Sequence, residues 1–121
     1  MIIVAERINA TRKAIREALE KKDREFFIQE AQKQEKAGAA FIDVNAGTEA
    51  TKEVTDLKWL VESIQDEIEI PLCLDSANDQ ALEAALTVYR KKEVMINSFT
   101  AEENRIKALL PIVKKYNALV V

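Results

Sequence analysis

The chain has 121 residues, a length typical of one domain, and with 48% hydrophobic and 32% charged residues it is not intrinsically disordered. Its 18 basic and 21 acidic side chains give a net charge of -3, which argues against a nucleic-acid-binding protein. The sequence contains no histidine and one cysteine, so histidine-dependent triads, histidine-ligated zinc and an internal disulfide are excluded. Its N-terminal apolar run, residues 1–5, is too short for a signal peptide or a membrane span. We therefore expect one soluble, cytoplasmic domain over residues 1–121.

Short apolar runs rich in β-branched residues recur along the chain and predict strands. They cover residues 2–4, 40–44, 71–74, 94–96 and 118–121. The runs are nearly continuous rather than alternating, which is typical of strands buried on both faces of a parallel sheet.

Longer segments with helical periodicity lie between these runs. They cover residues 12–22, 23–38, 54–68, 78–86 and 100–113. Asp23 and Asn78 are predicted N-caps, and Gly38 is expected to end the second helix. Pro111 lies inside the last segment and is expected to kink or restart it. The alternation of strands and helices predicts an α/β fold with right-handed crossovers and a parallel sheet covered by helices.

Polar side chains follow each of the first four predicted strands. These are Glu6-Arg7-Ile8-Asn9, Asp43-Val44-Asn45, Asp75-Ser76 and Asn97-Ser98. The carboxyl ends of parallel strands meet at one edge of the sheet, where α/β proteins bind their ligands. Each such residue taken alone could equally serve a turn or a helix cap, but four in series favour a ligand site.

The residue types restrict the ligand. Gly38 and Gly47 are the only glycines, and neither belongs to a phosphate-binding loop, which argues against a dinucleotide site. Neighbouring carboxylates and amides suit a flat heterocycle held by in-plane hydrogen bonds. Oxygen ligands from Glu6, Asp43 and Asp75 are compatible with magnesium, but their spacing does not require it, and we predict no metal.

The motifs at these strand ends resemble those of a known family. The matching motifs are Glu6-Arg7-Ile8-Asn9, Asp43-Val44-Asn45-Ala46-Gly47, Leu72-Cys73-Leu74-Asp75-Ser76 with Asn78, and Met95-Ile96-Asn97-Ser98. They resemble the pterin-binding barrel of dihydropteroate synthases, of the folate module of cobalamin-dependent methionine synthase, and of methyltetrahydrofolate–corrinoid methyltransferases. The third and fourth motifs are closest to the methyltransferases, and the resemblance runs over essentially the whole chain.

The resemblance implies a set of pterin-binding residues. Asp75 would accept hydrogen bonds from the 2-amino and ring N–H groups of the pterin, and Asn97 would bond the remaining polar edge of the ring. Asn9, Asp43 and Asn45 would line the pocket. Ser76 and Ser98, which follow in the same motifs, complete the set. The substrate implied is tetrahydrofolate or methyltetrahydrofolate, and the N5-methyl group would be exchanged with the cobalt of a corrinoid (cobalamin) held by a partner protein. No catalytic residue is assigned.

The resemblance also implies a TIM-type (β/α)8 barrel, a fold of roughly 250 residues. We therefore expect the N-terminal half of such a barrel, with four βα units and the start of a fifth strand. A half-barrel leaves two sheet edges unpaired, so we predict a homo-oligomer or association with a complementary half-barrel. Two alternatives stay open, a dihydropteroate-synthase-like pterin enzyme and a catalytically silent half-barrel with a structural or pterin-binding role.

Overall fold

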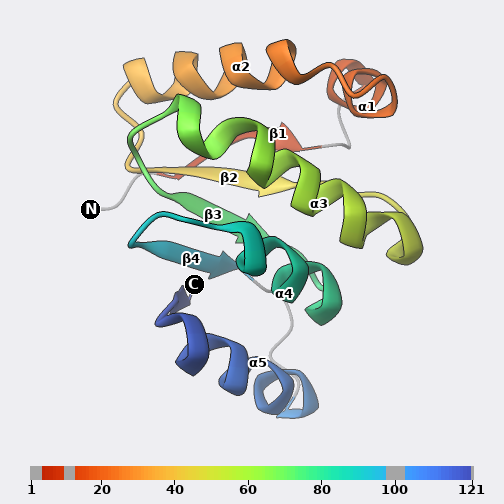
Figure 1. Cartoon of the computed structure of the whole chain (residues 1–121), viewed down its shortest axis with the longest axis vertical. Coiled ribbons are helices and arrows are strands. Elements are labelled where there is room, and N and C mark those ends of the chain that lie inside the picture. The colour runs from red at the N-terminus through yellow and green to blue at the C-terminus, as the bar shows by residue number, and fades with distance from the viewer. Residues whose placement is uncertain (1–3, 10–12, 98–102, 121) are drawn as a thin grey trace.

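A computed structural model of the chain describes residues 4–9, 13–97 and 103–120 (Figure 1). Within these ranges five strands form one sheet in the order β1-β2-β3-β4-β5, and every neighbouring pair is parallel. The strands are β1 (Val4–Asn9), β2 (Phe41–Asn45), β3 (Leu72–Asp75), β4 (Val94–Asn97) and β5 (Leu119–Val120). Sequential parallel order with helical crossovers is the arrangement of consecutive βα units of a TIM-type barrel, so the predicted fold class is confirmed.

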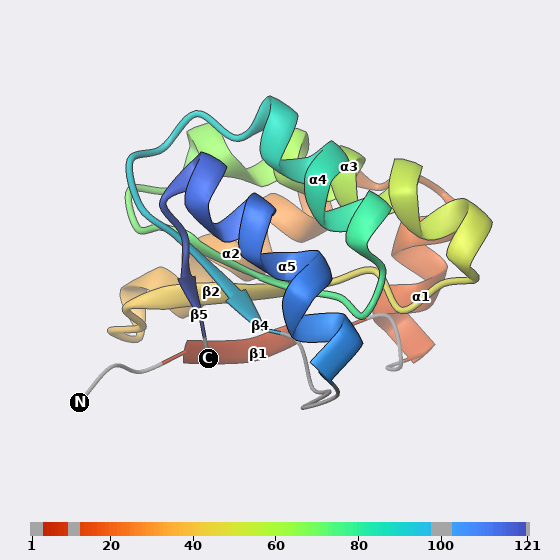
Figure 2. The ribbon, with the colours of Figure 1, turned by 90° about the horizontal axis from the view of Figure 1, so that it is seen from below.

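The helices connect the strands. They are α1 (Lys13–Glu20), α2 (Arg24–Lys36), α3 (Ala50–Ile64), the 3₁₀ helix η1 (Gln65–Glu67), α4 (Asp79–Val88) and α5 (Glu103–Tyr116). Two helices precede β2, as the sequence predicts, and single helical crossovers follow. Figure 2 shows α3 and α4 together on one side of the strands. No helix in the described part of the chain is long and apolar enough to cross a membrane.

The helix ends follow the local sequence. The Asp23 carboxylate accepts a hydrogen bond from the backbone N–H of Phe26, at 3.2 Å, and caps α2. Gly38, with φ +95°, ends the same helix: its N–H donates to the Glu35 carbonyl, and the N–H of Ala39 donates to the Gln34 carbonyl. This pair of bonds is a Schellman motif, which favours glycine at the left-handed position. Both predicted signals are therefore confirmed.

Two expectations from the sequence are wrong, those for the end of the first strand and for the burial of the last, and one of the two alternatives at Pro111 is excluded. The first strand does not end before the polar motif but runs through it to Asn9, because an irregularity between Ala5 and Ile8 accommodates one extra residue against β2. Helix α5 continues through Pro111, so the helix does not restart there. Strand β5 is exposed rather than buried on both faces, because it pairs only with β4 within the described residues.

The sheet separates two apolar groups of side chains. The larger group packs between the strands and the helices and includes Ile42, Leu74 and Ile96, each fully buried. Phe41, Cys73 and Met95 form a smaller buried cluster on the opposite face. Because successive strand residues point to opposite faces, this division fixes which side chains face away from the helices. Cys73 is thus a buried core thiol.

Trp59 also belongs to the packing of the helices. It lies on α3, and its ring meets that of Phe27 on α2 edge-to-face, with centroids 5.8 Å apart. The Lys22 ammonium lies 5.0 Å from the centre of the Trp59 ring, at cation–π distance. These contacts fix α2 against α3.

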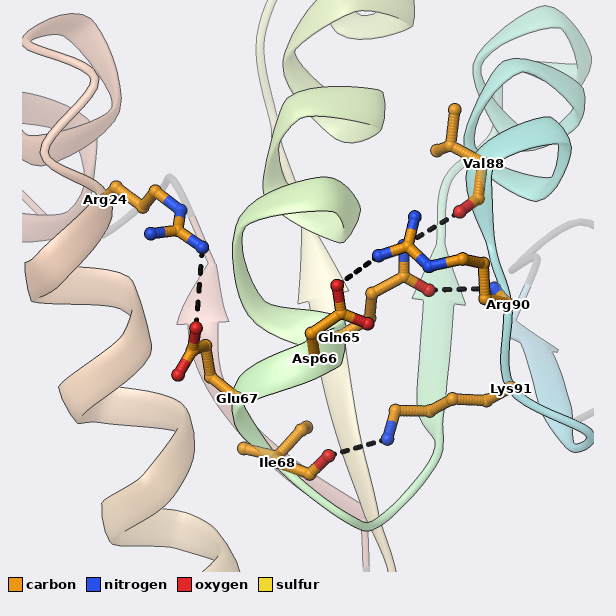
Figure 3. A network of polar contacts seen from close by, with 8 residues as sticks. All are labelled: Arg24, Gln65, Asp66, Glu67, Ile68, Val88, Arg90 and Lys91. Carbon is orange, nitrogen blue, oxygen red and sulfur yellow. Dashed lines mark hydrogen bonds and ion pairs between the residues drawn. The ribbon is translucent and has the colours of Figure 1, made fainter.

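Hydrogen bonds hold the amino edge of the sheet, where η1 meets the segment before β4 (Figure 3). Gln65, 1% exposed, donates through Nε2 to the Val88 carbonyl and accepts through Oε1 from the Arg90 N–H, each at 2.8 Å. Lys91 donates to the Ile68 carbonyl at 2.7 Å. The guanidinium of Arg90 also pairs with Asp66, but both side chains are largely exposed, so this ion pair adds little stability.

Tyr89 is a second polar link at the same edge. Its hydroxyl accepts from the Leu72 N–H at 3.1 Å and donates to the Glu93 carbonyl at 2.5 Å, which ties the start of β3 to the turn before β4. Burial raises the pKa of Tyr89 to about 12. The phenol therefore stays neutral and keeps its donor throughout the neutral pH range.

We expect Gln65→Leu to lower the free energy of unfolding by about 3 kcal/mol, because the Val88 carbonyl and the Arg90 N–H would lose their partner in a buried place. Urea unfolding at neutral pH measures the loss. Gln32→Leu is the matched control, since Gln32 also donates to a backbone carbonyl, that of Glu67, but in an exposed position. A control loss as large as that of Gln65→Leu would contradict the assigned role of Gln65.

Candidate ligand site

Four predicted site residues share one face of the sheet at its carboxyl edge. On β2, Asp43 and Asn45 alternate with Ile42 and Val44, which pack toward the helices. The same alternation gives Asp75 the face of Cys73 on β3 and gives Asn97 the face of Met95 on β4. We refer to Asp43, Asn45, Asp75 and Asn97 as the rim cluster.

The parallel register brings the rim cluster together. Asp75 pairs with Asn97 across β3 and β4, and Asp43 lies one layer lower, beside Cys73. The Asn45 amide donates through Nδ2 to Asp75 Oδ2 at 3.5 Å. The two carboxylates are buried, with exposures of 3% for Asp43 and 4% for Asp75, while Asn45 and Asn97 are partly exposed. The rim cluster therefore combines two buried carboxylate acceptors with two amides that are accessible to solvent.

The three other predicted site residues are Asn9, Ser76 and Ser98. Asn9 is opposite Asn45 in the register of β1 with β2, which places its backbone beside the rim cluster. Ser98 lies outside the described residues. The backbone N–H of Ser76 donates to the Asn97 carbonyl at 3.3 Å and so extends the pairing of β3 with β4.

The Ser76 side chain is bonded to neighbouring protein groups. Its hydroxyl donates to Oε1 of Glu53 on α3 and accepts from the Asn78 N–H at 2.9 Å. Ser76 is 4% exposed. In this structure the hydroxyl thus joins the β3–α4 loop to α3, a contact that the sequence prediction of a pterin-binding serine did not include.

None of the four rim-cluster residues lines either of two hollows found in the described part of the chain. One, of about 570 Å³, lies between α1 and the start of α3 and is lined in part by Arg16, Lys22 and Lys52. The other, of about 620 Å³, is a shallow groove between the start of α3 and the β3–α4 loop. Both hollows are lined by helix and loop residues. The rim cluster lies on the sheet face opposite the helices, and its carboxylates and amides are therefore separate from both hollows.

The rim cluster can recognise a polar ring by hydrogen bonds. Ionised carboxylates accept from ring N–H and amino groups, whereas each amide offers one acceptor and two donors. No group of three cysteine, aspartate or glutamate side chains in the described part of the chain is arranged to hold a metal ion. Hydrogen-bonding recognition is the chemistry that carboxylates and amides in this arrangement offer.

Sequence reasoning did not identify Glu53 or Asp56. Asp56, on α3, accepts from Lys22 Nζ at 2.5 Å and ties the turn after α1 to α3. Both residues act across 20 or more positions of sequence. A charged residue within an amphipathic helix gives no signal of such a distant partner, although Asn78, which shares the Ser76 contact, was identifiable as a cap.

Consecutive parallel βα units of this kind define a protein of the TIM-barrel class, in which the carboxyl edge of the sheet is the usual place of the ligand site. The family model described as pterin binding enzyme matches residues 5–121, and the chain belongs to this family. A curated relative, the methylcorrinoid:tetrahydrofolate methyltransferase of Eubacterium limosum, is 38% identical over 112 residues. The match covers 93% of this chain and 41% of the relative, so the chain spans less than half the relative's length.

We expect Asn45→Asp to destabilise the chain by about 2 kcal/mol at neutral pH, because a second carboxylate would replace the amide donor beside Asp75. Protonation of one carboxyl would relieve the repulsion, so the loss should shrink as the pH falls toward about 4. Thermal unfolding over this pH range measures both effects. Gln29→Glu makes the same amide-to-carboxylate exchange at an exposed position of α2 and should change stability little. Equal pH dependence of the two variants would contradict the contact.

Proposed function

We propose that this chain binds the pterin ring of tetrahydrofolate or methyltetrahydrofolate through the rim cluster. We further propose that it takes part in methyl transfer between the folate and a corrinoid held by a partner protein. The observation that carries the proposal is the 38% identity to a methylcorrinoid:tetrahydrofolate methyltransferase over a segment that includes the rim cluster. Membership of the pterin-binding enzyme family supports the ring as the part recognised.

The geometry supports a division of roles in pterin recognition. Asp75 is buried and next to Asn97 in register, so one carboxylate and one amide present themselves side by side to the edge of a flat ring. We assign to Asp75 the 2-amino and ring N–H groups and to Asn97 the remaining polar edge. Asn45, which already contacts Asp75, and Asp43 would line the pocket with Asn9.

The reaction determines what the site must provide. When a methyl group passes from cobalt to tetrahydrofolate, the N5 lone pair forms the new N–C bond, the Co–C electron pair stays on cobalt, and N5 releases its proton. In the reverse direction N5 must gain a proton to leave. A fixed ring lowers the barrier in both directions because N5 is held in line with the methyl group. No described residue is assigned to the proton transfer.

The partner proposed is a corrinoid protein that approaches the carboxyl edge of the sheet, since the methyl group must reach N5 there. We place the chain in the cytoplasm, as the sequence predicts. The relative's name mentions a methylcorrinoid and tetrahydrofolate as its substrates, which supports the same pair here.

We expect calorimetric titration of the chain with methyltetrahydrofolate to show binding that weakens at least tenfold in Asp75→Ala and in Asn97→Ala. Each variant removes a ring contact at the rim and leaves a polar group of the bound ring without a partner, which costs about 1–3 kcal/mol. Glu62→Ala, which removes an exposed side chain of α3, is the control and should bind as the parent does. Absence of binding by the parent chain would overturn the proposal.

A second measurement separates the enzymatic function from a silent pterin-binding role. The chain is mixed with tetrahydrofolate and a methylated corrinoid protein, and the cobalt absorbance is followed. Loss of the methylcobalt band that depends on Asp75 supports the transferase. Pterin binding without any such change favours the silent module, and condensation of a pterin pyrophosphate with aminobenzoate favours the synthase.

We also propose that the chain associates through the edge of its sheet. Leu119 and Val120 of β5 are 47% and 56% exposed, and β5 lies at one end of the strand order with β1 at the other. Exposed apolar strand edges favour pairing with further strands.

We expect sedimentation velocity at micromolar concentration to show a dimer or larger species, because strand pairing would cover this edge. Val120→Lys should shift the distribution toward the monomer, since a charged edge side chain opposes pairing. Glu62→Lys, on the exposed side of α3, serves as the control for added positive charge. A parent chain that sediments as a monomer would contradict the association.

A further inference from the structure

We propose that Glu53 is a positioning residue for Asp75 and that it acts through Ser76 and Asn78. The inference rests on the proposed pterin site and adds to it a residue of α3 that does not belong to the rim cluster. The carboxylate of Glu53 accepts a hydrogen bond from the Ser76 hydroxyl, and Ser76 directly follows Asp75 in the chain. Glu53 is thus bonded to the residue next to the proposed pterin-binding carboxylate.

The bond between Glu53 and Ser76 joins two elements that are 23 positions apart in sequence. Ser76 is 4% exposed, so its hydroxyl is screened from water. A buried hydroxyl that loses its acceptor carries a penalty of about 1–3 kcal/mol, or must turn to another partner. The Asn78 carbonyl lies 3.5 Å from the same hydroxyl, so Glu53 is the nearer of its two acceptors. The direction of the Ser76 side chain, and with it the backbone just after β3, therefore depends mainly on Glu53.

Asn78 completes the connection. Its N–H donates to the Ser76 hydroxyl oxygen at 2.9 Å, and its amide Nδ2 donates to the Ala50 carbonyl at the start of α3, at 3.1 Å. Its Oδ1 accepts from the N–H groups of Gln80 and Ala81 and caps α4. The β3–α4 loop is consequently held at both ends, by α3 and by the cap of α4.

This connection lies directly beside the rim cluster. Ser76 also donates its N–H to the Asn97 carbonyl, at 3.3 Å, so one residue links Glu53 on α3 to two residues of the site. The Asp75 carboxylate accepts from the Asn45 amide, and its position also depends on the backbone that carries it. Ligand groups must be held to within a fraction of an ångström to recognise a ring edge, and a neighbouring shell of hydrogen bonds supplies that precision.

A purely structural role for Glu53 predicts different behaviour. If Glu53 only stabilised the packing of α3 against α4, its loss would lower the unfolding free energy without changing the affinity of the folded chain. A positioning role requires that affinity fall in chains that remain folded. It also requires that the effect depend on Asp75, because that is the group being placed.

The experiment compares Glu53→Ala, Glu53→Gln and Ser76→Ala with the parent chain at a temperature well below unfolding. We expect methyltetrahydrofolate to bind Glu53→Ala and Ser76→Ala about tenfold more weakly. Glu53→Gln keeps an acceptor oxygen for the Ser76 hydroxyl and should recover most of the affinity. Glu62→Ala, which removes an exposed glutamate from the same helix, should bind as the parent does.

A double variant that combines Glu53→Ala with Asp75→Asn tests whether Glu53 acts on binding through Asp75. Glu53→Ala should weaken binding much less in that background than in the parent, because the group it positions is already impaired. A full additional tenfold loss, or unchanged affinity in Glu53→Ala alone, would overturn the positioning role.

A ligand-free measurement keeps this inference separate from the proposed function. The ¹³C resonance of the Asp75 side-chain carboxyl should shift or broaden in Glu53→Ala and stay unchanged in Glu62→Ala. If the parent binds no folate, the pterin proposal fails while the carboxyl resonance still decides whether Glu53 positions Asp75. An Asp75 resonance that is identical in Glu53→Ala and the parent contradicts the inference even where binding is observed.

Discussion

The parallel register of β2, β3 and β4 is the constraint on which the candidate site depends. It aligns Asp43 with Cys73 and Met95 in one layer and Asp75 with Asn97 in the next. Because side chains alternate strictly along each strand, a shift of one residue in any pair would turn a carboxylate into the helix-covered core. The apolar side chains that pack against the helices thus also determine which way the polar ones face.

The two edges of the sheet use their polar groups differently. At the amino edge, Gln65 and Tyr89 bond to backbone groups of neighbouring segments, so their polar atoms serve the fold. At the carboxyl edge, Asp75 and Asn97 lie at strand ends and face away from the helices. In barrels of this class stability is concentrated at the first edge and ligand chemistry at the second. The hydrogen bonds in this chain follow the same division.

The sequence allowed much of this to be predicted because local signals agreed with one another. Asp23, Gly38 and Asn78 act within four residues of their own positions, and each cap is found where expected. The course of β1 was not predictable, because an irregularity in its pairing depends on the neighbouring strand. The bond of Glu53 to Ser76 was equally hidden, since only the packing of α3 beside the β3–α4 loop brings the two together.

The burial of Asp43 and Asp75 shows why the site needs support beyond its own residues. An ionised carboxylate loses solvation when it is buried, and hydrogen bonds recover only part of that free energy. A side chain of this kind turns toward water unless the backbone that carries it is held in place. The backbone at the end of β3 is held on one side by its pairing with β4 and on the other by the hydrogen bond of Ser76 to α3. A carboxylate fixed in this way, desolvated before the ligand arrives, binds N–H groups more strongly than a mobile one, because little reorganisation remains to be made on binding.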